Sequence, residues 1–149
     1  MKILVCTDGS EHSKKALGEA AVIAEGCNVD EVAIIHVHDP SLDKIFPYHV
    51  SISAEQMKNF QRIMEEQKAE REKILSKSLK FFEDKNIKTR TILKEGHPSH
   101  TIVNVAHEEG FDMIIIGSRG LGGLKKMFLG SVSNAVVQEV ENCSVLIVK

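Results

Sequence analysis

Two glycine-rich turns near the C-terminal end of the chain have residue types and a spacing that suit the binding of an anion. The apolar run 113–116 ends at Gly117, Gly120 follows, and after nine further residues the chain reaches Gly130 and Ser131. Glycine lets a backbone approach a bulky group closely, and the free N–H groups of a helix N-terminus attract phosphate. Ser131 is predicted to be the N-cap of the helix that follows. The segment therefore predicts a phosphate-binding loop between a strand and a helix.

The residues of this segment also allow plainer interpretations. Either turn by itself is common in strand-to-helix connections and indicates no ligand. The prediction therefore depends on finding both turns in one connection. The chain lacks the Gly-Lys-[Ser/Thr] of a Walker motif, and its first strand-to-helix turn lacks the three glycines of a dinucleotide fingerprint. Lys125 and Lys126 lie in the loop between the glycines. We interpret them as a solvated pair, with phosphate contact as the alternative.

Length and composition are those of one domain with an apolar core. The chain has 149 residues, of which 42% are hydrophobic, enough to bury about two-thirds of the unfolded chain's surface. A formal net charge of -2 gives no basic excess for nucleic acid. Cys6, Cys27 and Cys143 are odd in number and far apart, which favours reduced thiols over a disulfide framework. No apolar run suits a signal peptide or approaches the roughly 20 residues of a membrane span, so we expect a cytoplasmic protein.

Apolar runs of strand length alternate along the chain with segments of helical periodicity. Strands are predicted over residues 3–7, 32–37, 89–93, 113–117 and 144–148. Helices are predicted over residues 11–27, 53–84, 98–109 and 131–141, the second of which is almost wholly polar over 65–73 and is expected to project or bend there. This alternation predicts a Rossmann-like α/β fold, an open five-stranded parallel sheet of order 3-2-1-4-5 with helices on both faces.

The predicted topology brings residues that are far apart in the sequence to one crevice. Ligands of such sheets bind beyond the carboxyl ends of the strands, where the direction of winding reverses. In this strand order the reversal lies between the first and fourth strands, which end near Asp8 and Gly117, and Val37 ends the neighbouring second strand. Asp8 has a plainer interpretation, because either Asp8 or Ser10 could be the N-cap of the first helix.

The glycine pattern resembles the signature of a known family. Gly117-x2-Gly120-x9-Gly130-Ser131 resembles the G-x2-G-x9-G-[ST] signature of nucleotide-binding universal stress proteins. Residues 3–10, 36–39 and 95–98 resemble the family's opening strand and turn, its second strand end and the turn before its third helix. The resemblance extends over residues 1–149 and implies a single universal stress protein domain.

The resemblance implies ATP as the ligand, with Mg or Mn carried by the nucleotide. The implied contacts run from the base to the phosphate tail: the backbone of Val37 with the adenine edge, Thr7 and Asp8 near the sugar and metal, Gly117, Arg119 and Gly120 along the ribose and phosphates, and Gly130, Ser131, Val132 and Ser133 at the phosphate tail. Charge-assisted hydrogen bonds of this kind contribute about 1.5–3 kcal/mol each.

The function expected from these features is that of an ATP-binding stress-response or regulatory module. No nucleophile elbow or Ser-His-Asp order is visible, so no catalytic residue is predicted. Slow ATP hydrolysis, or autophosphorylation at Ser131 or Ser133, is the first alternative, and an interaction dimer that carries no nucleotide is the second. His36 with His38, and His97 with His100, are not joined by a carboxylate or thiolate at zinc-like spacing, so no dedicated metal site is predicted.

The fifth predicted strand is expected to form a homodimer. Val145, Leu146, Ile147 and Val148 are apolar on both faces of a strand at the edge of the sheet, and only Lys149 adds a charge there. An apolar edge without charge, proline or bulge is a template for pairing with another chain. A two-fold pair of antiparallel fifth strands closes such an edge, and the resemblance implies the same assembly.

Overall fold

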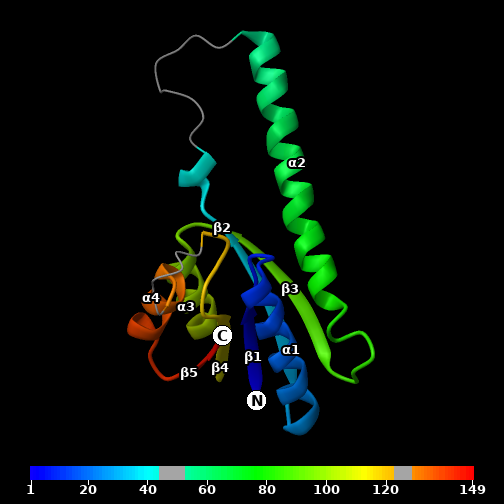
Figure 1. Cartoon of the computed structure of the whole chain (residues 1–149), viewed down its shortest axis with the longest axis vertical. Helices are drawn as coiled ribbons and strands as arrows, with labels where there is room; N and C mark the ends of the chain where they lie inside the picture. Colours follow the sequence, from blue (N-terminus) through cyan, green and yellow to red (C-terminus); the bar gives the residue numbers. More distant parts are fainter. Residues whose placement is uncertain (44–52, 123–128) are drawn as a thin grey trace.

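The computed structural model describes residues 1–43, 53–122 and 129–149, and within them the predicted α/β architecture is confirmed (Figure 1). The strands are β1 (Lys2–Cys6), β2 (Glu31–His38), β3 (Lys88–Glu95), β4 (Met113–Gly117) and β5 (Ser144–Val148). They form a parallel sheet in the order β3-β2-β1-β4-β5. The helices are α1 (Glu11–Gly26), α2 (Ala54–Leu79), α3 (Pro98–Glu108) and α4 (Ser131–Glu139), with a short 3-10 helix η1 (Pro40–Asp43) after β2.

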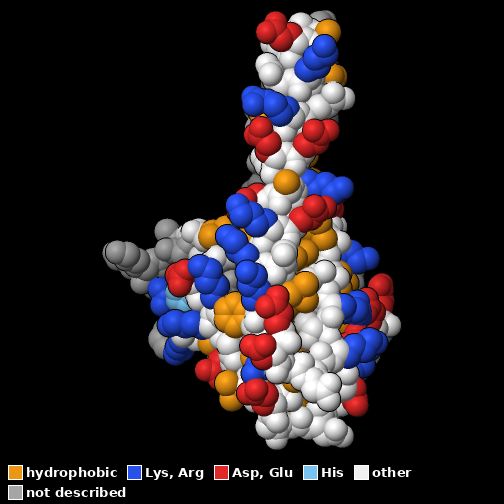
Figure 2. All heavy atoms as spheres, turned by 90° about the vertical axis from the view of Figure 1, so that its right-hand side faces the viewer, with side chains coloured by type: hydrophobic (Ala, Val, Ile, Leu, Met, Phe, Trp, Pro, Cys, Tyr) orange, Lys and Arg blue, Asp and Glu red, His pale blue; other side chains and the backbone are white. Residues whose placement is uncertain are grey.

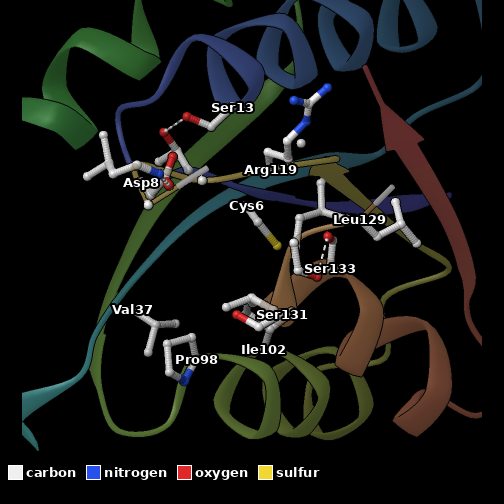
Figure 3. Close-up of a pocket in the computed structure, with 18 of the residues that line it drawn as sticks. Cys6, Asp8, Ser13, Val37, Pro98, Ile102, Arg119, Leu129, Ser131 and Ser133 are labelled. Atoms are coloured by element: carbon white, nitrogen blue, oxygen red, sulfur yellow. Dashed lines mark hydrogen bonds between the residues drawn. The ribbon is translucent and has the colours of Figure 1, made fainter. Parts of the chain in front are cut away.

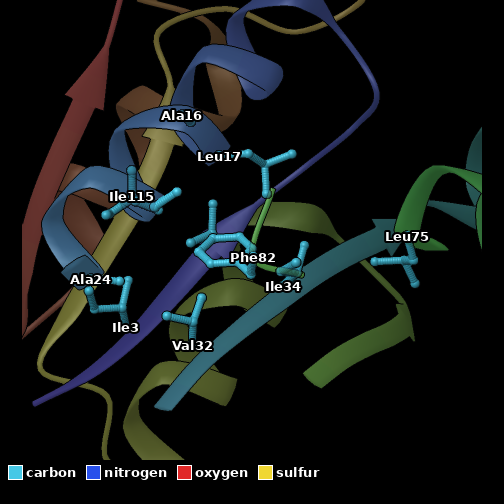
Figure 4. Close-up of a cluster of buried hydrophobic side chains, with 12 residues drawn as sticks. Ile3, Ala16, Leu17, Ala24, Val32, Ile34, Leu75, Phe82 and Ile115 are labelled. Carbon is cyan, nitrogen blue, oxygen red and sulfur yellow. The ribbon is translucent and has the colours of Figure 1, made fainter. Parts of the chain in front are cut away.

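Two apolar layers hold the helices against the sheet. On one face, Ile3 and Val5 of β1 pack with Leu17 of α1 and with Phe82, which follows α2 (Figure 4). On the other face, strand residues that include Leu4 and Cys6 pack with side chains of α3 and α4. Because both faces are covered, the central strands are buried along nearly their whole length, as parallel strands usually are.

The second and third strands are longer than the apolar pattern predicts. β2 and β3 pair over eight positions, from Glu31 opposite Lys88 to His38 opposite Glu95. Backbone hydrogen bonds do not depend on side-chain polarity, so the ladder continues past the apolar residues into charged ones at both ends. At the other end of the chain α4 stops at Glu139, short of the predicted residue 141, because Val140 is already extended.

Helix α2 is one unbroken helix that extends well beyond the carboxyl ends of the strands (Figure 1). It begins after a capping box, in which Ser53 and Gln56 bond each other's backbone, and ends at Leu79 rather than at the predicted residue 84. Among its described residues only Leu75 and Ser78 are buried. The expected polar projection therefore covers the whole first half of the helix, whose outward face carries charges of both signs (Figure 2). The helix does not bend.

None of the helices in the described ranges is both long and apolar enough to cross a membrane.

An ion-pair network joins β2 to β3 at the amino end of the sheet. The Glu31 carboxylate, whose side chain is 11% exposed, accepts hydrogen bonds from Lys88 Nζ (2.7 Å) and Arg90 Nε (2.5 Å). Arg90 also pairs with Glu109, which follows α3, and lies over the Phe111 ring. The hydrogen bonds from Lys88 and Arg90 lower the pKa of Glu31 to about 2. This network therefore stabilises the fold only while Glu31 is ionised.

We expect acid to weaken the fold through Glu31. Its pKa is lower in the folded chain than the value of about 4.3 in an unfolded chain, so this contribution is complete above about pH 4.3 and is lost as the pH falls toward 2. Glu31→Gln should remove about 1.5–3 kcal/mol of stability at pH 7 and should flatten the decline between pH 4.3 and 2. Urea unfolding at several pH values measures both effects. Glu66→Gln, at an exposed ion pair, is the control, and equal pH profiles for both variants would contradict the assignment.

Candidate functional site

A cavity of about 470 Å³ lies where the carboxyl ends of the strands meet α3, α4 and the glycine-rich loop (Figure 3). It opens at the reversal of winding between β1 and β4, as the topology predicts. All the residues proposed from the sequence line it: Thr7, Asp8, Val37, Gly117, Arg119, Gly120, Gly130, Ser131, Val132 and Ser133. Residues 123–128, which include Lys125 and Lys126, lie outside the described part of the chain.

One wall of the cavity is apolar and was largely missed by the sequence motifs. Ile35 of β2 and Cys6 of β1 line it together with Pro98 and Ile102 of α3. Two spacings in the sequence could have identified three of these residues. Ile35 lies two residues before Val37 and so shares its face of β2, and Pro98 and Ile102 are one helical turn apart. This wall suits a flat, largely apolar group.

The backbone of Val37 presents polar groups to the cavity. Ile35 accepts a hydrogen bond from Thr7 N (2.9 Å), whereas His38 accepts one from Gly96 N on the β3 side (2.9 Å). Because alternate residues of a strand direct their N–H and C=O groups to opposite neighbours, Val37 directs both of its groups toward β1. β1 ends at Cys6, opposite Ile35. The polar edge of Val37 therefore extends past the end of β1.

The opposite wall is the start of α4, and its capping differs from the prediction. Gly130, not Ser131, is the N-cap, and no side chain caps the helix. Ser131 occupies the first helical position because Gly130 already has the extended backbone of a cap residue. The N–H groups of Ser131, Val132 and Ser133 have no acceptor within the helix. These donors give the start of α4 an affinity for anions.

Ser118 fastens the two ends of the glycine-rich loop to each other. Its carbonyl accepts hydrogen bonds from Gly130 N (2.7 Å) and from Ser133 Oγ (3.1 Å). Ser133 Oγ also lies 3.0 Å from the Gly130 carbonyl, and Ser133 is buried. The buried hydroxyl of Ser133 therefore has a structural role.

The three glycines of the motif are not equivalent. A Cβ on Gly117 would lie 2.7 Å from the backbone carbon of His12, and a Cβ on Gly120 would lie 2.5 Å from Asp8 Oδ2. The α1 backbone therefore requires glycine at Gly117, whereas a side chain at Gly120 would require the Asp8 carboxylate to move. A Cβ on Gly130 would approach no atom outside its chain neighbours more closely than 3.4 Å, and the φ of Gly130 is -69°. Among the described residues, nothing requires glycine at Gly130.

Asp8 and Arg119 both line the cavity, yet their charged groups face other parts of the protein. Asp8 Oδ1 accepts a hydrogen bond from Ser10 N (2.9 Å), and Asp8 Oδ2 accepts one from Leu121 N (3.0 Å). The N-cap of α1 is Ser10, which decides between the two candidate caps. The Arg119 guanidinium points away from Val37 and Ser131, toward α1 (Figure 3).

Cys6, in the apolar wall, and His36, beside the cavity, are both neutral titratable groups. Burial raises the pKa of the Cys6 thiol, so this residue remains protonated. Burial also lowers the pKa of His36, an effect that the hydrogen bond from its Nδ1 to the Thr7 carbonyl (2.8 Å) opposes. Within the described residues, no three or more His, Cys, Asp or Glu side chains form a group that could hold a metal ion. The His97 and His100 rings contact each other, and His100 pairs with Glu139 (3.0 Å).

One known protein family matches the whole chain. The family model described as "Universal stress protein family" matches residues 1–149. The chain belongs to the universal stress protein family. Universal stress protein YxiE of Bacillus subtilis is 38% identical over 156 aligned positions, which cover 99% of this chain and 98% of YxiE.

Solved structures of universal stress proteins share the fold. The structure of MJ0577, from Methanocaldococcus jannaschii, superposes with a TM-score of 0.83 at 31% identity, and the match covers 99% of this chain and 94% of that one. A universal stress protein solved in complex with cAMP has a TM-score of 0.67 at 23% identity, over 99% and 95% of the two chains. At that identity the second likeness shows the fold alone.

We expect alanine substitutions to separate the two kinds of glycine in this universal stress protein. Gly117→Ala forces a methyl group against the α1 backbone and should lower the free energy of unfolding by about 1–3 kcal/mol. Gly130→Ala has room for the methyl group and should stay within about 1 kcal/mol of the wild type. Urea unfolding without ligand measures both. A larger loss for Gly130→Ala than for Gly117→Ala would contradict this assignment.

Proposed function

We propose that the chain is an ATP-binding universal stress protein that acts as a nucleotide-dependent regulatory module in the cytoplasm. The observation that carries the proposal is the freedom of Gly130 at the start of α4. None of the described residues requires glycine there, but the close approach of a phosphate group to the first N–H groups of α4 favours it. The three unpaired cysteines favour a reducing compartment.

The proposed nucleotide extends from the apolar wall to α4. Adenine packs between Ile35, Pro98 and Ile102 and bonds the free backbone edge of Val37. The ribose lies near Thr7 and Asp8. The phosphates follow Gly117, Arg119 and Gly120 and end at Gly130 and at the N–H groups of Ser131, Val132 and Ser133. The dipole of α4 favours negative charge at that end.

Two solved relatives guide the choice of ligands to test. One universal stress protein was determined with cAMP, and another, from Archaeoglobus fulgidus, with dAMP. Because they are only 23% and 22% identical to this chain, they serve here only to choose adenine nucleotides as probes. ATP, AMP and cAMP therefore belong in the same binding experiment.

A divalent metal fits the proposal as part of the ligand. Both Asp8 oxygens already accept backbone hydrogen bonds, and no group of three metal-ligating side chains occurs in the described ranges. Mg²⁺ is commonly held by phosphate oxygens and water with few protein ligands. We propose that Mg²⁺ or Mn²⁺ enters on the phosphates, where it neutralises part of their charge.

The alternative of phosphoryl transfer concerns Ser131 rather than Ser133. Ser133 is buried and its hydroxyl lies within hydrogen-bond distance of two carbonyl oxygens, whereas Ser131 is exposed at the first position of α4. Any autophosphorylation is therefore proposed at Ser131. The same incubation that measures binding distinguishes this alternative, because it would release ADP and label the protein.

We expect Mg-ATP to stabilise the wild type by about 2.7 kcal/mol at a hundred times its dissociation constant. Gly130→Val should abolish that gain without unfolding the chain, because the larger side chain occupies space needed by phosphate. Gly18→Val, at a helix position with open space around it, is the control and should keep the gain. Thermal unfolding with and without Mg-ATP measures the effect, and bound and hydrolysed nucleotide are counted per chain. A full shift in Gly130→Val would refute the phosphate assignment.

We also propose a homodimer through β5. Ser144 N donates to Asp112 O (3.0 Å), and Val148 O accepts from Ser118 N (2.6 Å), so these residues direct their backbone groups toward β4. By the same alternation Leu146 faces β4, whereas Val145 and Ile147 direct their N–H and C=O groups to the open edge of the sheet. The open edge is apolar and offers donors and acceptors to an antiparallel copy.

The two possible proline substitutions in β5 should therefore differ. Ile147→Pro removes a donor from the open edge and should give a monomer with a melting temperature near that of the wild type. Leu146→Pro removes a donor from the ladder with β4 and should destabilise the fold itself. Light scattering with thermal unfolding separates the outcomes. A wild type that is monomeric at micromolar concentration would refute the dimer.

A further inference from the structure

An apolar stripe runs along α2 and continues into the half of the helix that projects beyond the sheet (Figure 1). Near the C-terminal end of α2, Ile74 lies against Gly9 of the β1–α1 turn, and Ser78 is buried. Steps of four and three residues, taken in alternation back from Ser78, lead to Ile74, Arg71, Gln67, Met64, Phe60 and Met57. This is the spacing of the a and d positions of a coiled coil, which share one face of the helix. The face that packs on the sheet therefore continues into the projecting half of α2.

The projecting part of this stripe is apolar and partly open to solvent. Met57 is 44% exposed, and Phe60, Met64 and the flanking Ile63 are half-buried. Gln67 has a buried Oε1 that accepts a hydrogen bond from none of the described residues. An exposed apolar face with a polar rim and a buried acceptor without a donor are both features of a surface that binds another protein.

We propose that the projecting stripe pairs with the same stripe of a second copy of this chain, with the two α2 helices antiparallel. In such a pair each a position packs against a d position of the other helix. Centring the pair on residue 62 places Phe60 against the partner's Met64. It also places Met57 against the partner's Gln67 and Ile63 against the partner's Ile63. Apolar side chains therefore meet apolar side chains over most of the contact.

The charges of α2 allow this antiparallel pairing and oppose a parallel one. Parallel pairing in register would set Arg71 against the partner's Arg71, and like charges that face each other across a contact destabilise it. Antiparallel pairing centred on residue 62 places each Arg71 beyond the last apolar residue of the partner's stripe. The residues that flank the stripe then meet without like charges, as Gln61 with Gln61, Lys68 with Ala54, and Glu70 with Gln56.

Gln56 offers a donor to the open acceptor of the stripe. Its amide oxygen accepts a hydrogen bond from Ser53 N in the capping box (2.9 Å), which leaves its amide nitrogen as a donor. In the antiparallel pair this nitrogen lies at the level of the partner's Gln67. The buried Oε1 of Gln67, which none of the described residues supplies with a donor, then has one.

The α2 contact is independent of the edge strand β5. α2 packs on β2 and β3, at the opposite edge of the sheet from β5. Pairing through α2 therefore leaves β5 free, and the two contacts together would join copies of the chain into assemblies larger than a dimer.

The first test is self-association without the β5 contact. In Ile147→Pro, light scattering at increasing concentration should show a monomer that forms dimers through α2. Met64→Lys, added to Ile147→Pro, keeps a good helix former but places a charge in the contact, so it should weaken dimer formation about tenfold or more. Val22→Lys, at a 64% exposed apolar residue of α1, is the matched control and should have no effect. Association that is absent at millimolar concentration, or that both lysine variants change equally, would overturn the proposal.

The second test leaves β5 unchanged and measures the direction of pairing. The background is Cys27→Ser, which removes the exposed cysteine. Met57→Cys mixed with Gln67→Cys should cross-link between chains with a short bis-maleimide several times more than either variant alone. Glu66→Cys mixed with Met57→Cys is the control, because residue 66 lies off the stripe. Greater cross-linking of each variant with itself would indicate a parallel pair, and cross-linking no faster than in the control would indicate no pair; either result overturns the proposal.

Discussion

At Gly117 the backbone of α1 comes so close to the end of β4 that no side chain fits between them. A Cβ on Gly117 would lie 2.7 Å from His12 C and 2.9 Å from Ser13 N. This approach joins the first helix to the fourth strand across the reversal of winding. It also brings the β1–α1 turn, with Asp8, beside the loop that leaves β4. The cavity owes its position to this contact, because the β1–α1 turn and the loop after β4, which both line it, belong to elements that the contact holds together.

Two attachments between described residues hold the loop after β4, and each has a separate task. Ser118 joins the loop's two ends, and Asp8 joins its first part to a rigid turn. Closing a loop of this length has an entropic penalty that grows only slowly with length, so a small number of hydrogen bonds of about 0.5–1.5 kcal/mol each can fix its ends. The first turn of α4 is then held in place with its N–H groups unpaired, ready for an anion.

The sequence predicts the sheet order and the position of the cavity because both follow from local patterns and from a topological rule, whereas most of the residues around the cavity were implied by the resemblance to the family. Apolar runs mark the strands, and the reversal of winding places the ends of β1 and β4 together. The different roles of Gly117, Gly120 and Gly130 could not be predicted, since each depends on what lies opposite in space. The hydrogen bond between Asp8 and Leu121 is hidden for the same reason. The predicted N-cap of α4 was wrong by one residue. Gly130 and Ser131 are both good cap residues, and only the backbone conformation decides between them.

Several of the described groups around the cavity that could take part in chemistry are engaged elsewhere or held neutral. The Cys6 thiol stays protonated, and the lowered pKa of His36 keeps its ring neutral while it bonds a carbonyl. The Ser133 hydroxyl and the Asp8 carboxylate both take part in holding the loop. Catalysis of phosphoryl transfer needs groups that stabilise the transition state more strongly than the bound substrate. Fixed N–H groups beside an apolar wall would hold a ground-state nucleotide as well as a transition state, and this is the physical ground for proposing nucleotide sensing.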